Sequence, residues 1–302
     1  MSEQVEIIEV GPRDGLQNQD AILSTEDKVS LIIRLLDAGA RRIEVASFVN
    51  PKRVPQMADG EAVLNALPSR ADATYIGLVL NERGLERALA TKVDEIGMVA
   101  VASDTFGLRN QKQTSAESVD VACRVLRDAK RAGRRAQVTI AVAFGCPFEG
   151  EVPESRVVGM AQKLAEAEPV EIAIADTVGV GVPSQAKSLL TALRKALPDM
   201  PLRCHFHNTR NTGIANAFAA LECGVRRLDS SVGGIGGCPF APAATGNIAT
   251  EDLLYMLNRS GFSTGYDLAK ITGMVPWLAP RLNLAELPAM VSRAGPLPPV
   301  AA

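Results

Sequence analysis

Short apolar segments rich in Val and Ile alternate along this chain with longer segments whose apolar residues recur every three to four positions. The longer segments, for example 25–38, 116–132, 153–167, 184–197 and 213–222, have helical periodicity and begin near Ser, Thr or Pro. The short segments are predicted strands, and they cover residues 6–11, 42–48, 74–80, 95–103, 137–144, 171–177, 202–208 and 227–232. Eight strand–helix units of about 30 to 40 residues predict an α/β fold, the (β/α)8 TIM barrel.

An open, doubly wound sheet would show the same alternation, but the polar residues at the carboxyl ends of the predicted strands favour the barrel. These residues are Arg13 and Asp14, Glu44 and Ser47, Asn81, Ser103 and Asp104, Asp176 and Thr177, His205 and His207, and Ser230 and Ser231. In a closed barrel all of these ends form one rim, which is where the active site lies.

The pattern loosens after Asn258. A helix is expected around Leu268 to Leu278, and a Pro-rich stretch follows from Pro288 to Ala302. Because no linker divides the chain, residues 1–302 are expected to form one domain. Residues 261–302 would be a small C-terminal appendage on the barrel that ends in a flexible tail.

Composition and charge narrow the possible partners. Of the 302 residues 47% are hydrophobic, and 32 basic against 34 acidic residues give a net charge of -2, without a basic block. Nucleic acid is therefore not an expected partner. No signal peptide and no apolar run long enough to cross a membrane is evident, so a cytoplasmic location is expected. The five cysteines form no C-x-x-C pair, which indicates reduced thiols.

The two histidines of the chain, His205 and His207, stand two positions apart in a predicted strand. Strand alternation places both imidazoles on one face, as a metal site requires. Asp14 follows the first strand, which lies near the seventh in a closed barrel, so its carboxylate can reach the same point. Asn247 is a candidate for a further oxygen ligand. Such donors suit Mg²⁺ or Mn²⁺, and zinc stays open on residue types alone.

A glycine-rich segment after the eighth strand, residues 233–237, leads into Cys238. Glycines give this loop unusual backbone freedom, and Cys238 at its tip is the best candidate for a functional thiol. A phosphate-binding loop in a sugar-phosphate isomerase would also explain the glycines, but it would give no role to the cysteine or the histidine pair.

Several motifs together resemble the hydroxymethylglutaryl-CoA lyase family over almost the whole chain. They are residues 11–18 (GPRDGLQN), 47–49 (SFV), 54–57 (VPQM), 145–150 (GCPFEG), 176–181 (DTVGVG) and 231–240 (SVGGIGGCPF). The resemblance implies that Mg²⁺ or Mn²⁺ is held by Asp14, His205, His207 and Asn247. It also implies that Arg13 acts on the substrate carbonyl, that Glu44 supports the site and that Cys238 is reactive.

Two segments depart from the family pattern. Residues 208–211 read Asn-Thr-Arg-Asn where these lyases have Asp-Thr-Tyr-Gly, and residues 241–245 lack the usual glutamine and glycine. His-x-His-Asn is similar to the related synthases that condense acetyl-CoA with a 2-keto acid. A synthase therefore stays an alternative to the lyase, and a non-catalytic metal- or acyl-binding barrel is a third.

The resemblance implies cleavage of 3-hydroxy-3-methylglutaryl-CoA, or of a related branched 3-hydroxyacyl-CoA, to acetyl-CoA and acetoacetate or the corresponding keto acid. Catalytic candidates are Arg13, Glu44, His205 and Cys238, with either His205 or Cys238 as the general acid. Substrate contacts are expected from Arg13, Ser47, Asp176 and Thr177. The expected partners are an acyl-CoA substrate and a second copy of the chain, in a homo-oligomer such as a dimer.

Overall fold

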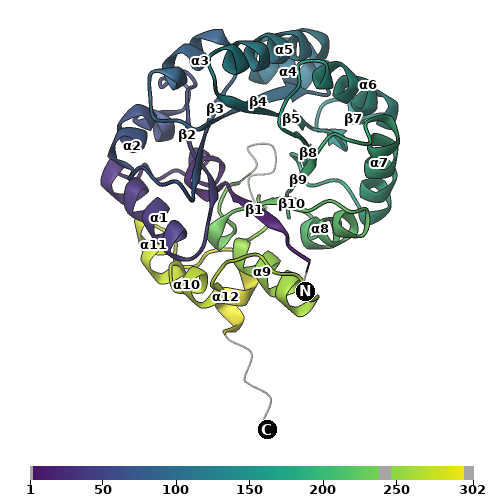
Figure 1. Cartoon of the computed structure of the whole chain (residues 1–302). Helices are drawn as coiled ribbons and strands as arrows, with labels where there is room; N and C mark the ends of the chain where they lie inside the picture. The colour runs from purple at the N-terminus through teal and green to yellow at the C-terminus, as the bar shows by residue number, and fades with distance from the viewer. Residues whose placement is uncertain (1–2, 238–245, 296–302) are drawn as a thin grey trace.

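The computed structural model describes residues 3–237 and 246–295, and its centre is a closed barrel of parallel strands (Figure 1). The strands are β1 (Glu6–Glu9), β2 (Arg42–Ser47), β3 (Thr74–Val79), β4 (Glu95–Val101), β5 (Arg135–Ala141), β8 (Ile172–Asp176), β9 (Leu202–Phe206) and β10 (Arg227–Ser230). They pair in the order β1-β10-β9-β8-β5-β4-β3-β2, and β1 closes the barrel against β10. The predicted TIM barrel is confirmed.

Helices form an outer ring around the strands (Figure 1). They are α1 (Thr25–Asp37), α2 (Gly60–Ala66), α3 (Glu82–Leu89), α4 (Asp104–Asn110), α5 (Ser115–Arg131), α6 (Glu154–Ala165), α7 (Pro183–Ala196), α8 (Gly213–Glu222) and α9 (Thr250–Arg259). Shorter elements follow the carboxyl ends of four strands: the π-helical turn η1 (Gly11–Gly15), the 3-10 turns η2 (Pro55–Met57) and η3 (Val232–Gly234), and the hairpin of β6 (Gly145–Cys146) and β7 (Gly150–Glu151).

Local sequence determines where the ring helices begin. The Ser24 hydroxyl accepts a hydrogen bond from the Asp27 N–H at 3.1 Å at the start of α1. At the start of α5, Thr114 Oγ1 accepts from the Glu117 N–H at 3.3 Å, and the Glu117 carboxylate accepts from the Thr114 N–H at 2.7 Å. Such caps satisfy N–H groups that have no partner inside the helix, and each contributes about 1 kcal/mol.

Three short helices follow α9: α10 (Leu268–Thr272), α11 (Val275–Arg281) and α12 (Met290–Ala294). The sequence predicted one helix here, but Pro276 in the first turn of α11 has no N–H with which to continue α10. The Trp277 ring lies between Arg34 of α1 and Arg281, 4.7 and 4.2 Å from their guanidinium carbons. The segment therefore packs on the helical ring, and residues 296–302 lie outside the described residues.

None of the helices in the described part of the chain has both the length and the apolar character needed to span a membrane.

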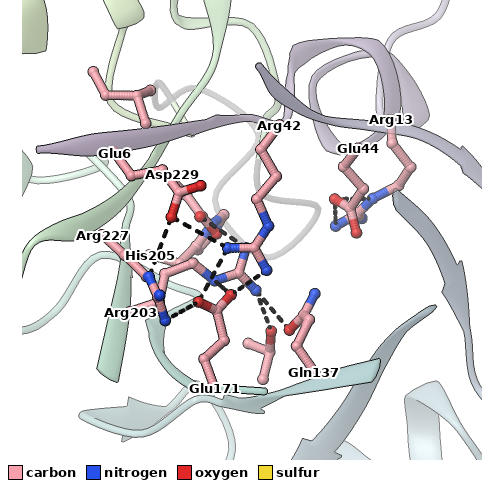
Figure 2. A network of polar contacts seen from close by, with 12 residues as sticks. Glu6, Arg13, Arg42, Glu44, Gln137, Glu171, Arg203, His205, Arg227 and Asp229 are labelled. Carbon is pink, nitrogen blue, oxygen red and sulfur yellow. Dashed lines mark hydrogen bonds and ion pairs between the residues drawn. The ribbon is translucent and has the colours of Figure 1, made fainter. Parts of the chain in front are cut away.

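Charged side chains fill the barrel interior towards the amino ends of the strands (Figure 2). Arg42 of β2 donates to both Glu171 oxygens, at 3.1 and 2.8 Å, and also contacts Glu95. Arg203 of β9 reaches the same Glu171, with its Nε 3.0 Å from Oε1. All four side chains are at most 4% exposed, so each buried charge depends on an opposite partner.

Candidate active site and metal centre

The turn η1 brings the first two site residues to the rim of the barrel. The chain leaves β1 directly into this single π-helical turn, which carries Arg13 and Asp14 side by side. The turn packs tightly on the segment after β10: a side chain on Gly15 would begin 2.7 Å from Ile235 Cγ1 and 2.8 Å from Ser231 Oγ. Single π-helical turns occur frequently at functional sites.

Asp14, His205 and His207 converge on one point. One ligand atom from each of the three lies within 4.8 Å of the other two. The two imidazoles extend from the end of β9 on the same side, with ring centres 5.0 Å apart. These side chains are therefore close enough to share one cation, as the sequence predicted from strand alternation and from the closure of β1 against β10.

Two buried polar atoms beside this point fit a metal ligand set. Asn247 forms an isolated bridge with His207, and its Nδ2 donates to Asp14 Oδ2 at 2.8 Å and to the Ile235 carbonyl at 3.2 Å. With both amide hydrogens engaged, Asn247 Oδ1 is buried and unpartnered, as is His207 Nδ1, among the residues described. Buried atoms of this kind need a partner, and a divalent cation would supply one.

The charge states of two of these residues also suit a cation. Burial raises the pKa of Asp14, but the charges of Arg13 and the two histidines outweigh it and hold that pKa below its ordinary value. Burial and the neighbouring His205 lower the pKa of His207 to about 3. At neutral pH Asp14 is an anion and His207 a neutral imidazole, which are the forms that bind metal.

Arg13 links the candidate ligand Asp14 to Glu44 in the middle of β2, and Figure 2 shows Arg13 beside Glu44. Its Nε and Nη2 both lie against Glu44 Oε2, at 2.7 and 2.6 Å, and its Nη1 donates to Asp14 Oδ1 at 2.7 Å. A guanidinium carries five N–H groups, so these contacts leave one on each terminal nitrogen for another acceptor. Glu44 therefore orients Arg13, and Arg13 keeps two donors for a further acceptor.

A cavity of about 1160 Å³ opens from these side chains. Its lining carboxylates are Asp14, Glu44 and Asp229, all of which belong to the site. Apolar side chains from the ends of the next strands form a wall: Phe48, Leu78, Leu80 and Val99. The loop after β2 and the helices α3 and α4 add cations: Lys52, Arg53, Arg83, Arg87 and Arg109. The cavity thus has an end formed by the candidate metal ligands and Arg13, an apolar wall and a cationic part.

The three predicted substrate contacts beyond Arg13 differ in position. Thr177 lines the cavity, and its hydroxyl accepts a hydrogen bond from the Val142 N–H at 2.9 Å. Ser47 is fully buried and does not line the cavity. Asp176 is also buried, and its carboxylate accepts the N–H groups of Val180 and Gly181, at 2.9 Å each. Substrate binding by Ser47 and Asp176 stays a prediction without a contact in the cavity.

Cys238 lies outside the described residues, but the glycines before it are described. Gly233, Gly234 and Gly236 have φ values of 71°, 68° and 115°, which residues with a side chain rarely adopt. The carbonyl of Gly237 accepts a hydrogen bond from Asn18 Nδ2 at 3.2 Å. The glycine-rich segment therefore follows a defined path as far as Gly237, which lines the cavity.

Sequence reasoning missed Asp229 and the cations of the cavity. Asp229 stands beside His205 in the barrel, with Oδ2 3.1 Å from Nδ1. The alternation of Arg227 and Asp229 in β10 was a signal for an inward-facing carboxylate. The cations come from three separate segments, so only the folded barrel brings them to one cavity.

Comparisons with known proteins show the family of this chain. A family model described as HMGL-like matches residues 4–275. The chain is 44% identical to an (R)-citramalyl-CoA lyase from Chloroflexus aurantiacus, over 98% of this chain and 96% of that protein.

Two solved structures are also similar. The HMG-CoA lyase of Bacillus subtilis has a TM-score of 0.94 at 37% identity, covering 97% of this chain and 98% of that one. An HMG-CoA lyase from Acinetobacter baumannii, solved in complex with coenzyme A and 3-methylmalate, has a TM-score of 0.92 at 36% identity, covering 99% and 98%.

Proposed function

Because this chain belongs to the HMGL-like family, we propose that it is a divalent-metal-dependent lyase that cleaves a tertiary 3-hydroxyacyl-CoA between C2 and C3. The products are acetyl-CoA and a keto acid. The observation that carries the proposal is the cluster of Asp14, His205 and His207 beside Arg13, at the end of a cavity large enough for an acyl-CoA. The similar proteins are named lyases, which favours a lyase over the synthase and the non-catalytic barrel.

Mg²⁺ or Mn²⁺ is the proposed cofactor, held by Asp14, His205, His207 and Asn247. The carboxylate of Asp14 and the amide oxygen of Asn247, which has no partner among the described residues, favour these hard cations. A cation bound here acts as a Lewis acid that lowers the pKa of the substrate hydroxyl.

Residues of the chain are proposed to stabilise the developing charge and to transfer the protons. The free N–H groups of Arg13 donate to the thioester oxygen while negative charge develops there, as an oxyanion hole does, and Glu44 holds the guanidinium in place. Asp14 is a candidate to take the hydroxyl proton when the C2–C3 bond breaks. Cys238 is the candidate to protonate C2 of the departing acetyl-CoA, because His205 is assigned here to the cation.

The cationic part of the cavity fits the coenzyme A portion of the substrate. Its 3′-phosphate and diphosphate are anionic, and the exposed cations Lys52, Arg53 and Arg83 can pair with them. The apolar wall of Phe48, Leu80 and Val99 suits the pantetheine chain between the phosphates and the thioester.

The departure at Asn208 lies outside the cavity lining and does not oppose a lyase. Its Oδ1 accepts the Gly213 N–H at 3.1 Å at the start of α8, and its backbone N–H donates to the Gly246 carbonyl at 2.6 Å. An aspartate could accept the same hydrogen bond. Asn208 therefore orders the turn after β9, and the choice of Asn does not itself favour condensation chemistry.

The acyl group is proposed to be 3-hydroxy-3-methylglutaryl, with (R)-citramalyl as the second candidate because of the 44% identical relative. The two differ by one methylene between the carbinol carbon and the carboxylate. One methylene changes kcat/KM by roughly 10- to 200-fold.

Purified enzyme with Mn²⁺ should therefore be assayed with both thioesters, scoring acetyl-CoA together with acetoacetate or pyruvate. The proposal expects both products from one thioester with a clear preference over the other. Condensation of acetyl-CoA with a 2-keto acid, without cleavage of either thioester, would overturn it.

A further inference from the structure

His205 differs from His207 in how its ring is supported. His205 Nδ1 lies 3.1 Å from Asp229 Oδ2, whereas His207 Nδ1 is buried and has no hydrogen-bond partner in residues 3–237 and 246–295. A neutral imidazole carries one proton, and the nitrogen without it is the one that binds metal. Because a carboxylate beside Nδ1 favours a proton there, it leaves the Nε2 lone pair available.

We propose that Asp229 and Arg203 are positioning residues that hold His205 as the Nδ1–H tautomer, with Nε2 available to a cation shared with Asp14 and His207. This inference rests on the metal centre proposed above and adds two residues behind it. A carboxylate that orients a ligating histidine typically changes metal affinity by 10- to 100-fold.

Arg203 is what fixes the direction of the Asp229 carboxylate. Arg203 Nη1 donates to Asp229 Oδ1 at 3.0 Å, so the two carboxylate oxygens are divided between Arg203 and His205. Asp229 and Arg203 are 5% and 3% exposed, so water competes little for either. Asp229 therefore presents one defined oxygen to the ring.

Arg203 is itself anchored from other strands of the barrel (Figure 2). Its Nη2 donates to Gln137 Oε1 of β5 at 2.7 Å, and its Nε lies 3.0 Å from Glu171 Oε1 before β8. Three directions of contact leave the guanidinium little freedom. The charged interior of the barrel thus connects to the candidate metal centre through Arg203, Asp229 and His205.

The tautomer can be measured directly because the chain has two histidines. Long-range ¹H–¹⁵N NMR of the metal-free protein, labelled at histidine and kept in alkaline buffer, distinguishes the tautomers, and His207→Gln assigns the signals. The expected result is that His205 is protonated at Nδ1. Wild-type His205 protonated at Nε2 would overturn the proposal.

Asp229→Asn keeps the shape of the side chain but can present an N–H to the ring. It should move the His205 proton to Nε2 and weaken Mn²⁺ binding, measured by titration, by about 10- to 100-fold. Arg203→Met should also weaken Mn²⁺ binding, because Asp229 loses its anchor. If Arg203→Met does not fold, Asp229→Asn still decides the question.

Glu95→Gln is the matched control. It makes the same carboxylate-to-amide change in the same buried network, but Glu95 contacts Arg42 and not Asp229. In this variant the His205 tautomer and the Mn²⁺ affinity should equal those of the wild type, even if the Tm falls. Equal effects of Glu95→Gln and Asp229→Asn would overturn the positioning role. If the wild-type protein binds no Mn²⁺, the proposed metal centre is wrong. This outcome is distinct from the tautomer result, because the tautomer is measured without metal.

Discussion

Arg13 contacts two carboxylates of the site and still has N–H groups to spare. Arg13→Gln removes charge that matters mainly in the transition state, so kcat should fall by about 10²- to 10³-fold while KM changes little. Steady-state kinetics on the purified variant measure both quantities. If Arg13 only neutralises Asp14 and Glu44, thermal stability would fall instead and kcat would stay within about threefold of wild type, well inside the effect of losing one oxyanion donor.

Cys238 is the functional thiol that the sequence predicts, and it lies outside the described residues. Cys223 is the C-cap of α8, does not line the cavity and provides a matched control. Cys238→Ser should lose most lyase activity and keep Mn²⁺ binding, whereas Cys223→Ser should keep both. Similar activities of the two variants would remove Cys238 from the mechanism.

Among single residues, the sequence predicted that Asp14, His205 and His207 meet at one point, which the structure confirms. Period-two alternation placed His205 and His207 on one face, and the order of strands brought Asp14 to them. Asp229 was missed because its alternation with Arg227 indicates only which face of the strand it occupies, and not that it lies beside His205. Its role depends on a neighbouring strand, which the sequence pattern does not specify residue by residue.

Two buried carboxyl groups connect η3 to the elements around it. Glu9 of β1 accepts the Val232 N–H at 2.9 Å and the Thr250 hydroxyl at 2.7 Å, and Glu251 of α9 accepts the Gly233 N–H at 3.0 Å. Burial raises the pKa of Glu9 to about 7 and that of Glu251 to about 8. The start of the glycine-rich segment is therefore hydrogen-bonded to two carboxyl groups, Glu9 and Glu251, whose burial favours the neutral form.

The pH dependence of stability follows from these raised pKa values. Between the ordinary carboxyl pKa of 4.5 and about pH 8, the folded state holds protons at Glu9 and Glu251 that the unfolded state has released. The contribution of these two groups to the free energy of unfolding is therefore fully present below pH 4.5. It is lost as the pH rises towards 8.

Glu251→Gln keeps a neutral acceptor at every pH, so it should flatten this decline. Melting curves of wild type and variant should differ more at pH 9 than at pH 6, with the variant the more stable at pH 9. Each 1 kcal/mol corresponds to roughly 2 to 4 °C in Tm. Parallel pH profiles of the two proteins would contradict the burial effect at Glu251.

The loop after β2 and the start of α3 supply cations for the phosphates of coenzyme A in this account. Arg83→Ala should raise KM for the acyl-CoA by up to about fivefold, the value of one exposed ion pair, and leave kcat nearly unchanged. Arg131→Ala is the control, because Arg131 is 77% exposed on α5 and does not line the cavity. An equal KM change in both variants would indicate a general effect of net charge.

At the scale of the whole molecule, periodicity was sufficient for the barrel because its strands are short, apolar and separated by amphipathic helices. The sequence did not predict the π-helical turn η1 or the charged interior around Arg42. Both depend on contacts between distant strands. The expected dimer and the cytoplasmic location stay predictions.

In the proposed function, a divalent cation held by Asp14, His205 and His207 is required to cleave the 3-hydroxyacyl-CoA. The most direct measurement is acetyl-CoA release from the preferred thioester by enzyme that has been exhaustively chelated and then reloaded. Chelation should abolish turnover and Mg²⁺ or Mn²⁺ should restore it, whereas the activity of Asp14→Asn should not be restored at the same metal concentration. Full turnover by the metal-free enzyme would contradict the account.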